Sequence, residues 1–198
     1  MNTILKNITY LINKSNISIL GSLYSSEYTL DYILSLVDNI IKLPEEYYNI
    51  NYDNIISFVN SNSDKIIYID MSLLYFDKKN NNVISKSNHI SKFTRFLREL
   101  SSDKDVKFIL INHIYESMMS GSYGEYSFSG GRTILFIADF VCMITNNEIK
   151  ILKNRYNDFE GSYLINEIIR DDKLEKILDD EISFSDFKIK ELYETEDN

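Results

Sequence analysis

Residues 106–111 read VKFILI and run directly into the polar pair Asn112-His113. A loop rich in glycine and tyrosine follows, and a second apolar run, FVCMI, occupies residues 140–144. Short apolar runs with many β-branched residues, bounded by turn residues, are typical of buried strands. Because ligands of open α/β sheets bind where such strands end, the polar pair marks a candidate site.

Outside this centre, the sequence alternates between helical and strand-like patterns. Apolar residues recur at helical spacing over residues 3–13, 26–41, 52–59 and 90–100, with the last helix expected to begin near residues 87–88. Apolar runs predict strands over residues 16–20, 65–70, 149–152 and 162–165. The alternation predicts a three-layer α/β core with a mostly parallel central sheet and an antiparallel edge, over residues 1–165. Residues 166–198 are expected to form a separate acidic segment.

Composition and charge narrow the class of protein. A chain of 198 residues with 44% hydrophobic residues can bury a core and is not typical of disorder. Most of the net charge of −9 lies in residues 171–198, which repel phosphate backbones. The single cysteine, Cys142, lies in an apolar run and is expected to be a core residue. No apolar run approaches the roughly 20 residues of a membrane span, and no signal peptide is visible, so we expect an intracellular protein without a membrane partner.

Residues 16–41 combine a strand, a glycine, a small polar loop and a helix, which is the topology of a phosphate-binding loop. Such a loop reads G-x-x-x-x-G-K-[ST], whereas residues 21–28 read GSLYSSEY. Gly21 keeps the first glycine, but Ser26, Glu27 and Tyr28 replace the second glycine, the lysine and the hydroxyl residue. Two unit charges at about 4 Å interact by about 4 kcal/mol at an effective dielectric near 20, so a carboxylate in the lysine's place repels phosphate strongly. We expect no nucleotide binding here.

The stretch from Val106 to Arg155 resembles the second half of a RecA-type ATPase core. The resemblance rests on the strand ending in Asn-His, the glycine-rich loop, the Ala-Asp-Phe-Val at residues 138–141 and the Lys-Asn-Arg at residues 153–155. Phage UvsX-like recombinases match best, and DnaB-type helicases share the Lys-Asn-Arg-Tyr-like ending. The resemblance extends more loosely over residues 16–165.

This resemblance implies a nucleotide site that has degenerated. Asp70 ends a strand at the place of the aspartate that holds magnesium through water, and His113 lies where these ATPases sense the γ-phosphate. The alternative for His113 is a polar strand end bonded to loop backbone. The glutamate that activates water is expected to be missing, because its nearest candidates, Glu45 and Glu46, follow no recognisable apolar strand.

The resemblance also implies two DNA-binding loops. Lys78 and Lys79 lie at the position of the first loop, and residues 115–132 correspond to the second. Three tyrosines of that second loop could stack bases at about 1–3 kcal/mol each, with a cation at its edge; these residues are Tyr115, Tyr123, Tyr126 and Arg132. The same composition suits a loop that orders against a protein partner.

Lys153 and Arg155 match a pair that RecA-type subunits extend to the neighbouring subunit's γ-phosphate, although two cations at a strand end are also ordinary surface residues. No metal site is expected, because the histidine and acid of His113 and Glu116 lack further ligands nearby in the sequence.

Together these patterns predict a P-loop-deficient RecA/UvsX-like protein of DNA recombination, repair or replication, working with a RecA-like homologue, with copies of itself or with single-stranded DNA, and without a cofactor. The alternatives are a divergent but active DNA-dependent ATPase using ATP and magnesium, or a RecA-fold interaction or structural protein outside DNA metabolism.

Overall fold

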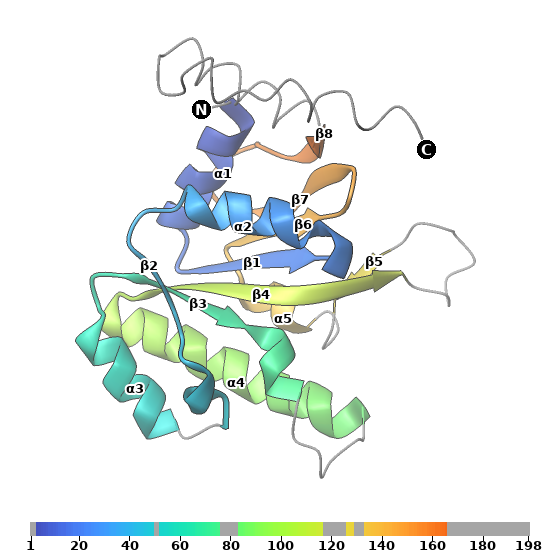
Figure 1. Cartoon of the computed structure of the whole chain (residues 1–198). Coiled ribbons are helices and arrows are strands. Elements are labelled where there is room, and N and C mark those ends of the chain that lie inside the picture. Colours follow the sequence, from blue (N-terminus) through green and yellow to red (C-terminus); the bar gives the residue numbers. More distant parts are fainter. Residues whose placement is uncertain (1–2, 50–51, 76–82, 117–125, 129–132, 166–198) are drawn as a thin grey trace, which may run out of the picture.

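The computed structural model describes residues 3–49, 52–75, 83–116, 126–128 and 133–165 (Figure 1). Several sequence predictions lie outside these residues: the acidic segment 166–198, the first-loop lysines Lys78 and Lys79, and the second-loop residues Tyr123 and Arg132.

One sheet organises the structure, with its strands in the order β2-β3-β4-β1-β6-β7-β8. The first five strands in this order pair in parallel, and β7 and β8 add an antiparallel edge. A further strand, β5, pairs antiparallel with the end of β4. The strands are Ile17–Ser22 (β1), Ile40–Lys42 (β2), Ile66–Asp70 (β3), Lys107–Glu116 (β4), Tyr126–Phe128 (β5), Phe140–Ile144 (β6), Glu148–Asn154 (β7) and Gly161–Leu164 (β8).

Helices cover both faces of the sheet (Figure 1). The α-helices are Thr3–Lys14 (α1), Glu27–Ser35 (α2), Tyr52–Ser61 (α3), Val83–Lys104 (α4) and Thr133–Ile137 (α5), and the short 3-10 helices are Tyr24–Ser26 (η1), Glu45–Asn49 (η2) and Met71–Tyr75 (η3). One buried cluster joins the sheet to α1 and α2, and the other joins it to α3, α4 and α5. The expected three-layer α/β core is therefore confirmed.

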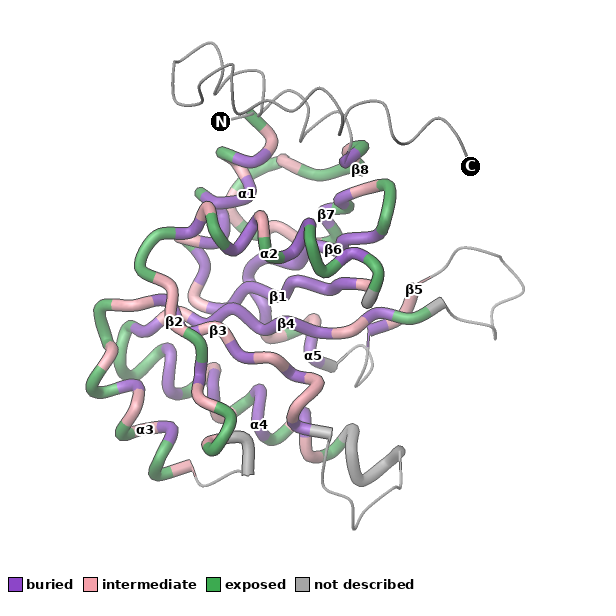
Figure 2. The backbone as a smooth tube through the Cα atoms, viewed as in Figure 1, coloured by how far each residue is buried: buried purple, intermediate pink, exposed green. Residues whose placement is uncertain are grey.

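The central strands β1 and β6 are buried throughout because both of their faces are covered. Every residue of β1 and of β6 is buried, and the tube in Figure 2 is purple along both strands. Along β1, Ile19 joins the cluster under α3–α5 and Leu20 joins the cluster under α1 and α2. A continuous apolar run, rather than an alternating one, is the pattern of a parallel strand covered on both sides. Cys142 of β6 is one of these buried residues, and burial raises the pKa of its thiol.

The prediction of one helix over residues 26–41 is wrong at its end. The helix α2 ends at Ser35, and Ile40 and Ile41 belong to the edge strand β2, which pairs with β3. Asn39 reverses the chain between them in the left-handed region (φ 54°), which asparagine tolerates better than most residues. Ile33, Val37, Ile40 and Ile41 share a helical spacing by coincidence, so periodicity alone merged the two elements.

Two smaller predictions also need correction or completion. The helix α4 begins at Val83, before the cap expected near residues 87–88. Thr133–Ile137 form the short helix α5, where no helix or strand was predicted. The predicted strand at 140–144 is confirmed as β6 with the same bounds, and those at 149–152 and 162–165 are confirmed as β7 and β8 with bounds that differ by one or two residues.

Candidate functional site

The carboxyl ends of β1 and β4 form the topological switch point of the sheet. From β1 the chain passes through α2 on one face to reach β2, and from β4 it passes through α5 on the other face to reach β6 (Figure 1). Where neighbouring strands send their connections to opposite faces, the carboxyl edge opens into the crevice that binds ligands in open α/β sheets.

Three residues predicted for the degenerate nucleotide site meet at this edge. Ser22 of β1 pairs with His113 of β4, and Gly21 pairs with Asn112 one residue earlier. Asp70 ends β3 on the other side of β4, opposite Ile111. Because alternate residues of a strand face the same side, Asp70 and His113 project toward the face covered by α1 and α2, as the side chains of Tyr68 and Ile111 do.

The connection from β1 to α2 does not have the form of a phosphate-binding loop. Gly21 and Ser22 still belong to the strand, and only Leu23 and η1 separate them from α2. The amide of Leu23 donates to the carbonyl of Ile144 at 3.3 Å, and the amide of Ser26 donates to the carbonyl of Leu23 at 3.0 Å. A phosphate-binding loop needs such amides for the ligand, so this turn has already used two of them.

Ser26 has a structural contact of its own. Its buried hydroxyl donates to the side-chain carbonyl of Asn146 at 3.1 Å, which ties the start of α2 to the turn between β6 and β7. Glu27 and Tyr28 occupy the first turn of α2 and are exposed, Tyr28 to 72%. The carboxylate of Glu27 complements the positive end of the helix, so a protein acid stands where a phosphate would be drawn.

Asp70 is engaged by the residue two positions later. One of its carboxylate oxygens accepts hydrogen bonds from the amide of Ser72 at 2.9 Å and from its hydroxyl at 2.6 Å. This is the local turn that aspartate makes at the end of a strand, and it opens η3. Asp70 therefore ends β3, as the strand predicted over residues 65–70 requires.

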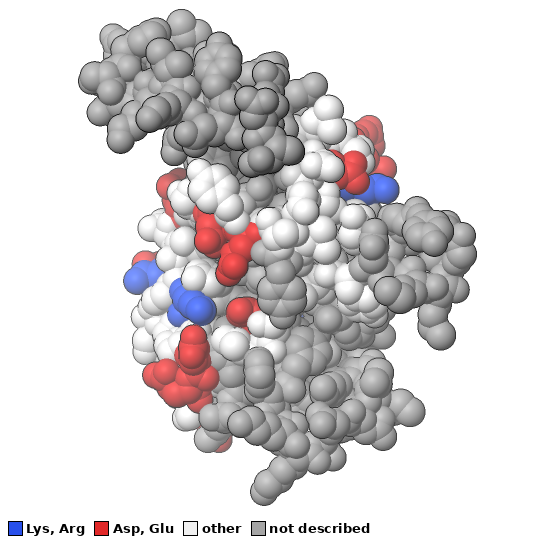
Figure 3. All heavy atoms as spheres, turned by 45° about the vertical axis from the view of Figure 1, so that its right-hand side comes forward, with Lys and Arg blue, Asp and Glu red and all other residues white. Residues whose placement is uncertain are grey.

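The expectation that no strand precedes Glu45 and Glu46 is wrong. The strand is β2, and Glu45 and Glu46 follow it after Leu43 and Pro44, at the start of η2. Both glutamates are exposed, and Glu45 lies 3.9 Å from the ammonium of Lys42. Figure 3 turns the carboxyl side of the sheet toward the reader, and most of the charged side chains coloured there are acidic. The described acids Glu27, Glu45 and Glu46 follow the carboxyl ends of β1 and β2, and they disfavour phosphate further.

The two described tyrosines of the second DNA-loop prediction lie on opposite faces of a β-hairpin. Tyr115 of β4 pairs with Ser127 of β5, and Glu116 pairs with Tyr126. Since neighbouring residues of a strand point to opposite sides, Tyr115 and Tyr126 cannot stack on the same base. Tyr115 is 53% exposed, whereas Tyr126 packs against the buried cluster under α3–α5.

Lys153 and Arg155 lie at the other end of the sheet. Lys153 lies near the end of β7 and Arg155 directly follows that strand; β7 runs antiparallel to β6, so Lys153 pairs with Val141 at the amino end of the parallel strands. Arg155 forms an ion pair with Asp139 at 3.0 Å and also donates to the carbonyl of Phe136 at 3.2 Å. The ammonium of Lys153 donates to the carbonyls of Leu135 (2.9 Å) and Phe136 (3.2 Å). These contacts place both cations at the carboxyl end of α5, where helices favour positive charge.

Asp139 is the centre of this cluster at the amino edge, a role that the sequence patterns do not predict. Its carboxylate is buried, with 5% of the side chain exposed, and it accepts hydrogen bonds from the amides of Asn16 and Ile17 and from Arg98, in addition to Arg155. A lone acid inside the apolar run 133–144 is the available signal, because a buried carboxylate requires partners. Partial desolvation, followed by the charge of Arg155, lowers the pKa of Lys153.

Other site classes receive no support from the described part of the chain. Within it, no group of three or more His, Cys, Asp or Glu residues is placed to hold a metal ion. The described helices include none that is long and apolar enough to cross a membrane. No protein-family model and no curated protein sequence matches the chain.

Proposed function

We propose that this chain is a P-loop-deficient RecA/UvsX-like protein that acts in DNA recombination, repair or replication through assembly with other proteins or single-stranded DNA. The observation that carries the proposal is the combination of a parallel sheet, whose strands end at a common switch point, with a closed β1–α2 turn. Gly21, Asp70 and His113 share one edge at the switch point, which supports descent from a nucleotide-binding core. The amides of Leu23 and Ser26 are bonded within the protein, which supports the loss of the nucleotide.

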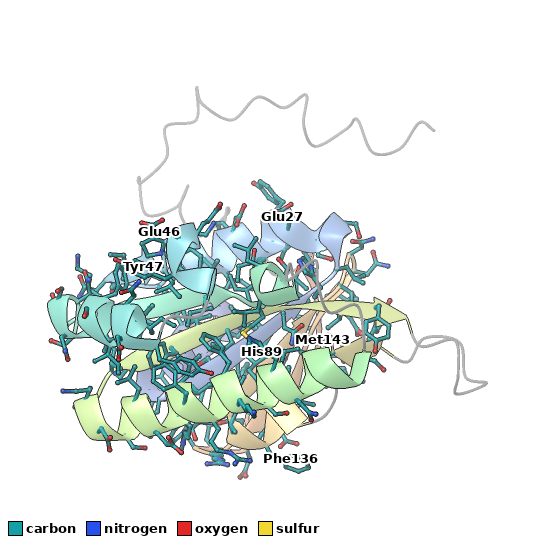
Figure 4. All side chains as sticks on the ribbon, turned by 90° about the horizontal axis from the view of Figure 1, so that it is seen from below. Glu27, Glu46, Tyr47, His89, Phe136 and Met143 are labelled. Carbon is teal, nitrogen blue, oxygen red and sulfur yellow. The ribbon has the colours of Figure 1, made fainter. Side chains whose placement is uncertain are left out.

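The proposal includes assembly because the carboxyl edge alone is not expected to bind a nucleotide. A subunit without its own nucleotide acts through surfaces that it presents to others. The amino edge offers Lys153 and Arg155 beside Phe136, a phenylalanine that is 74% exposed and points away from the fold (Figure 4). To act on a neighbour's phosphate, Lys153 must exchange the α5 carbonyls for that phosphate, which is a change of partners at one atom.

One observation favours the alternative of a divergent, active ATPase. The strand β2 leads to Glu45 and Glu46 at the carboxyl edge, so an acid able to activate water follows a strand after all. Glu27 in the first turn of α2 weighs against this alternative, because it places a carboxylate where the nucleotide's phosphates bind.

Co-purification tests the proposal directly. The tagged protein is expressed in its native host, and the chains bound to it are identified. We expect a P-loop-intact RecA-type protein or a single-stranded-DNA-associated complex among them. Recovery of partners that have no connection with DNA would favour the interaction or structural protein instead.

A further inference from the structure

Gly21 lies directly under an aromatic ring from the β-hairpin. A Cβ atom added at Gly21 would come within 2.4 Å and 2.7 Å of two ring carbons of Phe128, and within 2.9 Å of the Cγ2 atom of Ile114. Contacts below 3.0 Å force a neighbour to move. The space for a side chain at position 21 is therefore filled by the two strands of the hairpin.

The glycine is favoured here by space and not by backbone conformation, because a side chain would displace the ring edge of Phe128 and press on the Cγ2 atom of Ile114. Gly21 is an extended residue of β1, paired with Asn112 on one side and Met143 on the other. Its φ lies outside the left-handed region, which Gly161 occupies instead (φ 124°). A β-branched or aliphatic residue would otherwise suit a buried strand at this position.

The ring of Phe128 is the main anchor of β5. This strand has three residues, and Phe128 is 5% exposed and belongs to the cluster under α3–α5. Phe128 pairs directly with Ile114, which is also buried, so the two side chains close on Gly21 together. A two-stranded hairpin is marginal by itself, and its position depends on such packing.

We infer that the missing side chain of Gly21 makes room for the ring of Phe128, and that this contact positions the β4–β5 hairpin for ligand binding. The inference rests on the proposed function, in which the hairpin carries part of the surface for single-stranded DNA. The first glycine of the former phosphate-binding loop thus receives an aromatic ring. Gly21 and Phe128 are positioning residues, because both are buried, whereas the exposed Tyr115 on the opposite face of the hairpin is available for stacking.

Hydrogen exchange tests the contact between Gly21 and Phe128 without reference to DNA. The variants are Gly21→Ala, Phe128→Ala and the double variant, and the amides followed are those of Ile114–Glu116 and Tyr126–Phe128. In Gly21→Ala, we expect these amides to exchange at least about tenfold faster, while those of α3 keep their protection. The two substitutions should be strongly non-additive, because each removes the same contact.

A control variant distinguishes loss of the contact between Gly21 and Phe128 from a general loss of core packing. Val59→Ala removes a buried side chain from the same cluster, on α3 and away from β5. We expect it to lower stability without accelerating the hairpin amides relative to the rest of the sheet. Unchanged hairpin exchange in Gly21→Ala, or effects of Gly21→Ala and Phe128→Ala that simply add, would overturn the inference.

Binding of a fluorescent oligo-dT strand then tests the link to function. If the contact between Gly21 and Phe128 positions the hairpin, Gly21→Ala should weaken binding at least about fivefold. A loss of this size corresponds to roughly one stacked base. Faster hairpin exchange with unchanged affinity overturns the positioning role. Absence of binding by the wild-type protein contradicts the DNA part of the proposed function. The exchange result still decides whether the contact between Phe128 and Gly21 holds the hairpin in place.

Discussion

Asp139 and Arg155 are joined by a 3.0 Å ion pair that ties the end of β7 to the start of β6. The same carboxylate accepts from Arg98 of α4 at 2.9 Å and from two amides at the start of β1. Four segments that are distant in the sequence therefore converge on one buried acid. Two guanidinium groups around one carboxylate leave a positive balance, which Lys153 increases.

Replacing this carboxylate should destabilise the protein strongly. In Asp139→Asn, the ion pairs with Arg98 and Arg155 are lost and the half-buried Arg98 keeps an uncompensated charge. We expect the free energy of unfolding in urea to fall by about 3 kcal/mol. Asp103→Asn, an exposed acid at the end of α4, is the matched control and should change it by less than about 0.5 kcal/mol. Equal, small effects of the two substitutions would mean that the Asp139 cluster does not stabilise the fold.

Removal of the acidic segment should strengthen binding to single-stranded DNA. Residues 171–198 hold eleven acids against four lysines, and their removal takes away charge that repels phosphates. At low salt, the chain ending at residue 170 should bind oligo-dT more tightly than the full chain, and the difference should shrink as salt rises. Equal affinities at low salt would show that the segment does not compete, and a preference of the full chain for duplex DNA would contradict the assignment of the DNA loops.

Lys153 and Arg155 should matter in assays with an intact homologue. Ser26, Glu27 and Tyr28 replace the phosphate-binding residues of the loop, whereas Lys153 and Arg155 remain, which supports action across a subunit boundary. Adding this protein to a RecA-type ATPase from the same source should raise ATP hydrolysis by about tenfold or more, because a cation supplied in trans stabilises charge that develops in the transition state. Lys153→Ala and Arg155→Ala should abolish the effect.

The control for that assay is Lys150→Ala, which removes an exposed cation from the same strand. It should stimulate as wild type does. Since Lys153 and Arg155 also hold α5, the melting temperature of each variant is measured first. If folded variants of both residues stimulate as well as wild type, their contacts with α5 and Asp139 are their whole role.

The fold class could be predicted from the sequence because β3, β4 and β6 contain long apolar runs that each end at a polar residue. Those endings also located Asp70 and His113, which the sheet brings to one edge. The three-residue strand β2 could not be predicted, because its two isoleucines continue the helical spacing of α2 and the reversal at Asn39 leaves only a weak signal.

Contacts between distant segments were the other part beyond prediction. The opposite orientation of Tyr115 and Tyr126 follows from a hairpin register that the loop's composition does not encode. The packing of Phe128 on Gly21 joins residues that are 107 positions apart in the sequence. A glycine in a strand signals only that another group approaches the backbone closely at that point. Asp139 likewise acquires its role from Arg98 and Arg155, which the fold brings to it.

The most direct test of the central claim is a calorimetric titration of the full-length protein with ATP and magnesium. The closed turn at Leu23–Ser26, the carboxylate of Glu27 and the acidic carboxyl edge all oppose a bound triphosphate. We predict no binding heat up to about millimolar ATP, the weak end of affinities that calorimetry measures. A micromolar dissociation constant would contradict the account and establish an active nucleotide site.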